Sequence, residues 1–335
     1  MTAAPRRRGV VIRDSFHHGD QSQDIDPAET EAARAHLSAI TGWDIRFLHY
    51  DKLAIEDPMY CHLRLLEEIK ALRPEFIWYH PNFQSYLIHR NIRPEILYAA
   101  RVLYGSRLVF SFGDLAYLHV TAYAAGFAAI GDVSVSWDGN GARLAELVPG
   151  KTVLDLATPC DSRIYRDPGI ERDVDVCFIG QIHRYADRRG MLDALQARGV
   201  AVTVQGGEQG FYLSMEDYVG LLNRSKISLN FSQSKDGVHQ MKGRVLESIL
   251  CGALVLESEN DMTSRYLEPY RHYVPFGDAD DLAAKIRRYV ADDAARQAIV
   301  DAGKAHIEAT MSDHVWWRTI LDVLDRSKLD AGARR

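Results

Sequence analysis

The strongest constraint on the fold is a regular alternation along the chain: short apolar runs rich in Val, Ile and Phe are separated by longer stretches of helical period. Strands that are buried on both faces have such continuous apolar runs, and parallel neighbours need a long connection between them, usually a helix. The alternation therefore predicts an α/β fold built on parallel sheets with crossover helices.

The alternation occurs twice, which predicts two domains in a chain of 335 residues. In the first half we expect strands at 9–13, 44–50, 76–80, 107–112 and 133–137, and helices at 27–40, 60–72 and 94–104. In the second half we expect strands at 174–180, 200–205, 227–231, 253–257 and 272–275, and helices at 188–198, 215–223 and 242–251. The stretch 158–173 contains two prolines and no periodicity, so we interpret it as the linker. Beyond Asp278 only helices are expected, at 279–290, 293–310 and 313–329.

Charge and composition narrow the class of protein. The formal net charge is -6, with 47% apolar and 26% charged residues, which is the balance of a soluble globular protein. Because nucleic-acid binding needs a basic face, we expect no nucleic-acid partner. The apolar run after Arg6, Arg7 and Arg8 is too short for a signal peptide or a transmembrane segment. The four cysteines lack any paired spacing and are expected to be reduced core residues of a cytoplasmic protein.

The loop 232–240 and the helix after it carry the clearest binding signal. Ligands of parallel sheets bind beyond the carboxyl ends of the strands, and this loop follows one of them. Lys242 and Arg244 stand in the first turn of the helix, where acidic residues are normally favoured, and Gly243 lies between them. Two cations and free backbone amides at a helix start form a site for a diphosphate.

Glu247 lies one turn further along the same helix, among apolar residues. A carboxylate in that position needs a partner. The sequence leaves two alternatives open: a structural ion pair with Arg244 or Lys242, and hydrogen bonds to the hydroxyls of a ribose.

The segment 237–256, which contains Arg244-Val245-Leu246-Glu247 and Cys251-Gly252, resembles the donor-site segment of GT-B glycosyltransferases. It is most similar to the spore-maturation (CgeB-like) group, with the pattern R-x-F/L-E-x-x-x-C/A-G, within the glycosyl transferase group 1 families. The strand 175–180, the pair Arg188-Arg189 and the turn 276–282 resemble further parts of that domain. The resemblance implies that Glu247 binds the nucleotide ribose and that Lys242 and Arg244 neutralise the diphosphate.

The resemblance also implies a domain organisation: two Rossmann-like domains facing a cleft. We expect an N-terminal acceptor domain at 1–160, a C-terminal nucleotide-sugar donor domain at 161–312, and a C-terminal helix at 313–335 that can cross back to the N-terminal domain.

Other residues are candidates for the donor site. Gly180 ends a strand and lets backbone approach a phosphate, and Arg184 follows within reach of the same charge. Asn230 and Ser232 flank another strand end, where they either bind base or ribose or form the turn. His239 occupies the place where many retaining members of the fold carry a second glutamate. It either contacts the sugar or phosphate or has no role.

An inverting transfer needs a base for the acceptor hydroxyl, and loops after strands of the first domain are the expected place. The candidates are Asp14, His17, His18, Asp20 and Asp114. For each of them a role in loop structure is the alternative. His80 and Trp137 follow other strands at the same edge.

We expect no obligatory cofactor and no metal. Asp173-Val174-Asp175 has the form of a metal motif but begins a strand, at the wrong end for a ligand, and no dinucleotide or P-loop fingerprint occurs. The sequence thus predicts a metal-independent glycosyltransferase that moves a sugar from a nucleotide-diphosphate sugar to a hydroxyl of a glycan, lipid-linked sugar, small molecule or protein. Two alternatives stay open: a nucleotide-sugar 2-epimerase of the same fold and a non-catalytic nucleotide-sugar-binding protein.

Overall fold

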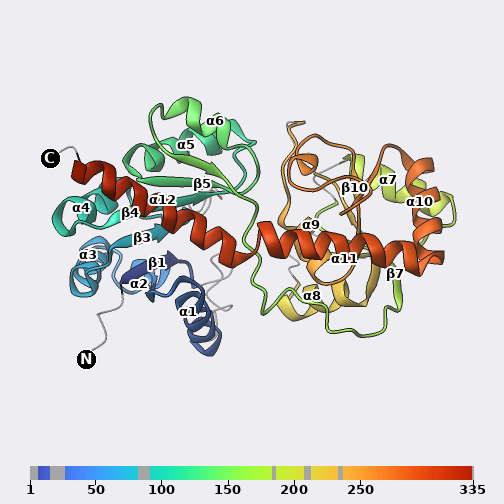
Figure 1. Cartoon of the computed structure of the whole chain (residues 1–335), viewed down its shortest axis with the longest axis horizontal. Coiled ribbons are helices and arrows are strands. Elements are labelled where there is room, and N and C mark those ends of the chain that lie inside the picture. Colours follow the sequence, from blue (N-terminus) through green and yellow to red (C-terminus); the bar gives the residue numbers. More distant parts are fainter. Residues whose placement is uncertain are drawn as a thin grey trace. The chain divides into compact units, whose positions relative to one another are not determined.

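The computed structural model describes residues 7–15, 27–81, 91–182, 186–206, 213–232 and 237–333. The chain forms two compact units (Figure 1). The first comprises residues 1–156 and 316–335, and the second comprises residues 157–315.

The first unit is built on a parallel sheet in the order β2-β1-β3-β4-β5-β6. Its strands are β1 (Arg8–Arg13), β2 (Asp44–His49), β3 (Phe76–Tyr79), β4 (Arg107–Phe112), β5 (Val133–Ser136) and β6 (Val153–Asp155). Its helices are α1 (Pro27–Thr41), α2 (Tyr50–Glu56), α3 (Cys61–Leu72), α4 (Pro94–Tyr104), α5 (Leu118–Ile130), α6 (Gly141–Leu147) and most of α12 (Asp313–Ala333). The strand order reverses direction between β1 and β3, which is the point where such sheets bind ligands.

Alternate residues of each strand fill two cores, one on each face of the first sheet. Val10, Ile12, Ile77 and Phe110 pack with helices α3, α4 and α5. On the other face, Val11 and neighbouring strand residues pack with Trp316, Trp317, Ile320 and Leu324 of α12. Residues 316–324 are therefore part of the core of the first unit, where α12 lies along the sheet (Figure 1).

The second unit is built on a parallel sheet in the order β11-β10-β9-β7-β8. Its strands are β7 (Val174–Ile179), β8 (Thr203–Gln205), β9 (Ser225–Asn230), β10 (Leu254–Ser258) and β11 (Val274–Phe276). Its helices are α7 (Ala186–Ala197), α8 (Met215–Arg224), α9 (Gly243–Leu250), the short 3-10 turn η3 (Thr263–Arg265), α10 (Ala279–Ala291) and α11 (Asp293–Thr310). Here the order reverses between β7 and β9, so the carboxyl ends of these two strands are the expected ligand-binding edge.

The two sheets confirm the predicted α/β class with two Rossmann-like domains. Five of the elements described above were not anticipated: α2, α5, α6, β6 and η3. The sequence of α5 is apolar on nearly all sides and shows no helical period, because its exposed face carries residues such as Leu118, Ala122 and Gly126 instead of charged ones. The strand expected at 200–205 is shorter than predicted, since only Thr203–Gln205 pairs with β7. No helix in the described part of the chain is long and apolar enough to cross a membrane.

Candidate functional site

The guanidinium of Arg244 lies at the point where the strand order of the second sheet reverses. Its Nη1 donates to Oδ1 of Asn230, the last residue of β9, at 3.2 Å. It also lies 5.8 Å from the ring centre of Phe178 in β7. Arg244 Nε is buried and has no hydrogen-bond partner among the described residues. A cation with unused donor capacity is therefore held at the ligand-binding edge of the sheet.

Gly180 permits this close approach. It follows β7 with φ +155°, and a Cβ built on it would lie 3.1 Å from Nη2 of Arg244. Any larger residue would crowd the guanidinium and strain the backbone. The glycine expected to let backbone approach a ligand thus also makes room for the cation that would bind that ligand.

Helix α9 begins beside this edge. Lys242 is its N-cap residue, provides no side-chain cap, and donates through Nζ to Oε1 of Gln240. The first turn contains no acidic residue. The helix itself therefore supplies no carboxylate in its first turn to complement its N-terminus.

Arg188 joins the two loops that border the site. This arginine is only 7% exposed, and its guanidinium donates to the carbonyls of Gln181 and Phe231 at 3.1 Å each. One buried side chain therefore ties the loop after β7 to the loop after β9. Arg184, a predicted donor-site residue, lies outside the described residues.

Glu247 faces tyrosines rather than the cations of its own helix. Its carboxylate accepts a hydrogen bond from the hydroxyl of Tyr218, and Tyr165 provides a second contact. Burial raises the pKa of Glu247, while Tyr218 and the charge of Arg244 oppose the shift. Arg244 bonds to Asn230 and Lys242 bonds to Gln240, and among the described residues no ion pair joins either cation to Glu247.

A second buried carboxylate, which the sequence analysis did not single out, lies at the end of β10. Glu257 is fully buried and accepts from Nδ2 of Asn230 and, at 3.3 Å, from Nδ2 of Asn260. Ser232 contributes further hydrogen bonds. Asn230 and Ser232 therefore do more than form a turn, since they connect Arg244 to Glu257.

His239 lies near the same strand ends with its Nδ1 3.4 Å from Oδ1 of Asp261. Asp261 is also paired with Arg265. The carboxylate of Asp261 thus orients the imidazole of His239.

Asp173 and Asp175, which have the spacing of a metal motif, each form an exposed ion pair instead. Asp173 binds Arg224 and Asp175 binds Lys226.

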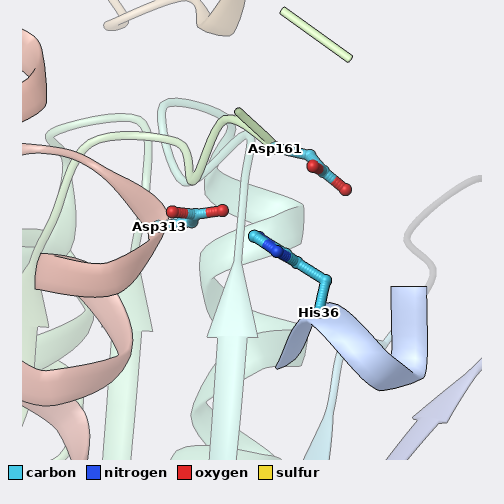
Figure 2. Close-up of side chains that lie close together, drawn as sticks. All are labelled: His36, Asp161 and Asp313. Atoms are coloured by element: carbon cyan, nitrogen blue, oxygen red, sulfur yellow. The ribbon is translucent and has the colours of Figure 1, made fainter. Parts of the chain in front are cut away.

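Elsewhere in the second unit, carboxylate oxygens of Asp161 and Asp313 lie within 4.8 Å of each other (Figure 2). Asp161 is engaged by Arg163, and the chain around both carboxylates is joined by a bridge between Cys160 and Ser312.

In the first unit, Asp14 follows β1 and Asp114 follows β4, and both are exposed. Asp114 adopts a left-handed backbone conformation with φ 57°. His17, His18 and Asp20 lie outside the described residues.

The imidazole of His80, which follows β3, is held in place at this edge of the first sheet. Its Nδ1 donates to the carbonyl of Ser111 at 2.8 Å, and its ring lies 4.4 Å from that of Trp137. Burial lowers the pKa of His80, so the imidazole is neutral and its proton is held on Nδ1. A neutral histidine of fixed tautomer has the chemistry of a general base.

Residues 184–322 match the protein family described as "Glycosyl transferase-like". No curated protein sequence gives a significant match. Among solved structures, HepE from Anabaena in complex with UDP and glucose is similar at a TM-score of 0.64 and 10% identity, with 96% of this chain and 100% of that chain covered. An alpha-glucosyltransferase in complex with UDP-glucose and DNA containing an abasic site is similar at 0.63 and 10% identity, with 96% and 100% covered. Sucrose-phosphate synthase from Thermosynechococcus elongatus is similar at 0.57 and 12% identity, with 98% and 99% covered.

The fold is that of GT-B glycosyltransferases, which have two Rossmann-like domains. Together with the family match over residues 184–322, it supports a glycosyltransferase that takes its sugar from a nucleotide-sugar donor. At identities near 10%, the similar structures show the fold of this chain and not its substrates.

Proposed function

We propose that this protein transfers a hexose from a UDP-sugar to a hydroxyl of an acceptor, without a metal ion, and that the second unit binds the donor. The proposal rests mainly on the position and the hydrogen bonding of Arg244. Its guanidinium lies against Gly180 and Asn230 at the reversal point of the sheet, with a buried Nε that has no hydrogen-bond partner among the described residues. An unsatisfied buried cationic donor at such an edge calls for an external anion.

The residues around Arg244 suggest individual roles in donor binding. Lys242, Gly243 and Arg244 would hold the diphosphate with the amides of the first turn of α9. Glu247 would accept hydrogen bonds from the ribose hydroxyls, with Tyr218 orienting its carboxylate. His239, oriented by Asp261, would donate to the sugar or to the phosphate nearest it. As the glycosidic bond breaks, these positive groups would stabilise the leaving diphosphate, so a metal is not required.

The choice of a UDP-sugar rests on the similar structures. HepE is described with UDP and glucose, and the alpha-glucosyltransferase with UDP-glucose. The pattern Arg244-x-Leu246-Glu247 followed by Cys251-Gly252 further supports membership of the spore-maturation (CgeB-like) group. The first unit would bind the acceptor, with Asp14, Asp114 or the neutral His80 as base.

The test is the binding of UDP-glucose by calorimetry. We expect the wild-type protein to bind it and Arg244→Ala to bind at least about tenfold more weakly, since one charge-assisted hydrogen bond contributes about 1.5–3 kcal/mol. Arg224→Ala is the matched control, because Arg224 is exposed and pairs with Asp173 before the start of β7. Equal affinity of Arg244→Ala and the wild type would refute the donor-site assignment. If UDP-glucose binds, incubation with and without an acceptor and analysis of the products would show whether the protein transfers the glucose.

A further inference from the structure

The carboxylate of Glu257 is coupled to the cation of the donor site through one amide. Arg244 Nη1 donates to Oδ1 of Asn230, and Nδ2 of the same amide donates to Oε2 of Glu257. A primary amide has its acceptor and its donor on opposite sides, so fixing one end orients the other. Arg244 and Glu257 are therefore the two ends of a single hydrogen-bonded chain that lies across the carboxyl ends of β9 and β10.

Glu257 has only neutral hydrogen-bond donors among the described residues. Asn230, Asn260 and Ser232 supply amides and hydroxyls, and the side chain is fully buried. A buried carboxylate without a directly paired cation is costly to keep ionised. Burial raises the pKa of Glu257 to about 7, and Arg244 is the cation whose charge opposes this shift.

The other elements around Glu257 supply little charge. From the segment before β11, the buried Tyr273 faces it, and burial together with the charge of Glu257 raises the pKa of that phenol to about 12. The loop after β10 carries Glu259 and Asp261, and Asp261 is engaged by His239 and Arg265. Hydrogen bonds from Ser232 and Asn230 oppose the rise in the pKa of Glu257, and the charge of Arg244 opposes it as well, so a change in charge at Arg244 alters the protonation of Glu257 near neutral pH.

We infer that Glu257 is a positioning residue of the donor site, which orients Arg244 through Asn230 and takes up a proton when a diphosphate binds to Arg244. The inference rests on the proposed donor site. An arriving diphosphate brings negative charge to the guanidinium and removes the compensation that Arg244 provides to Glu257. The proton comes from the solvent, and the new O–H group of Glu257 can donate a hydrogen bond to the hydroxyl oxygen of Ser232.

The sign of the pH dependence follows from linkage. Binding raises the pKa of Glu257 above its value of about 7 in the free protein, so the donor binds the protonated form more tightly. Affinity is then highest below pH 7 and falls as pH rises above it. For one proton the fall is at most about tenfold per pH unit.

Calorimetry with UDP-glucose in the full-length protein tests the inference. The probe suits the measurement because neither phosphate of its diphosphate ester titrates near pH 7. In two buffers of different ionisation enthalpy at pH 7.5, we expect uptake of a fraction of a proton per UDP-glucose bound, and an affinity that falls from pH 6.5 to 8.5. Binding to the wild-type protein without proton uptake would overturn the inference, whatever the variants do.

The variant Glu257→Gln tests whether Glu257 is the group that takes up the proton. The amide can still accept from Asn230 and donate to Ser232, so we expect UDP-glucose to bind with an affinity that changes by less than about twofold across this pH range and without proton uptake. Glu259→Gln, at an exposed carboxylate two residues away, should keep the wild-type pH dependence. Unchanged proton uptake in Glu257→Gln would also overturn the inference and leave the donor site standing. Failure of the wild-type protein to bind UDP-glucose at all would refute the donor site and the inference with it.

Discussion

At the scale of single residues, two carboxylates of the second unit accept hydrogen bonds from different neutral groups. Glu247 is satisfied by the hydroxyls of Tyr218 and Tyr165, and Glu257 by amides and Ser232. Burial raises the pKa of both. Each carboxylate therefore depends on hydrogen bonds from neutral groups for its stability.

Tyr218→Phe should destabilise the second unit by about 1–3 kcal/mol, because it leaves the partly buried carboxylate of Glu247 with one donor fewer. The measurement is urea unfolding followed by a probe in the second unit. Tyr98→Phe is the control, since Tyr98 is 50% exposed and should change stability by less than about 0.5 kcal/mol. If both variants unfolded at the same urea concentration as the wild type, the hydrogen bond to Glu247 would contribute nothing to stability.

The residues of the site were predictable from sequence to different degrees. Lys242 and Arg244 stood out because cations at a helix start contradict the usual preference for carboxylates. Glu257 did not, since a single acidic residue ending an apolar strand looks like the start of a loop. Only the register, which places Glu257 beside Asn230, shows that the two side chains meet. The tyrosine that bonds to Glu247 is 29 residues away in sequence, and no local pattern points to it.

At the scale of elements, the spacing of apolar residues predicted most of the strands and the amphipathic helices, but it missed helices in which no such spacing occurs. Helix α4 was expected at its observed bounds, opened by Pro94 and closed by Gly105. Helix α5 was missed because it is apolar nearly all round, and α2 and α6 because seven residues are too few to establish a period. Packing, rather than local sequence, determines such elements.

The contact of α11 with α9 depends on a close approach at Gly303. A Cβ on this residue would lie 2.9 Å from the carbonyl oxygen of His272 and 3.0 Å from Cγ2 of Ile249 in α9. Gly303→Ala should therefore push α11 outward and destabilise the second unit by about 1–3 kcal/mol, as measured by thermal unfolding. Gly220→Ala in α8 is the matched control. Its Cβ would meet no atom within 4 Å, so the gain in helix propensity should leave stability unchanged or raise it by up to about 1 kcal/mol. Stabilisation by Gly303→Ala would show that α11 does not pack as described.

At the scale of the whole molecule, the chain returns at its end to the unit in which it began. Trp316 and Trp317 are each at most 3% exposed and pack on Val11, Phe76 and Val109 of the first sheet. Arg7, just before β1, bonds to both Glu75 and Asp325, and its guanidinium lies 4.0 Å from the ring centre of Trp43. One face of the first sheet is therefore covered in part by a segment that lies far from it in the sequence.

Truncation of Trp317 should accordingly weaken the first unit and leave the second unchanged. Trp317→Ala removes an indole that contacts both Phe76 and Trp78, and the loss of a large buried aromatic side chain costs about 3–5 kcal/mol. Hydrogen exchange measures the two units separately: protection of amides in β1, β3 and β4 should fall, while that of β7, β9 and β10 should stay at the wild-type level. Arg318→Ala, on the exposed side of the same helix, is the control and should alter neither set. Equal loss of protection in both units would mean that they unfold as one cooperative body, because α12 begins in the second unit and ends in the first.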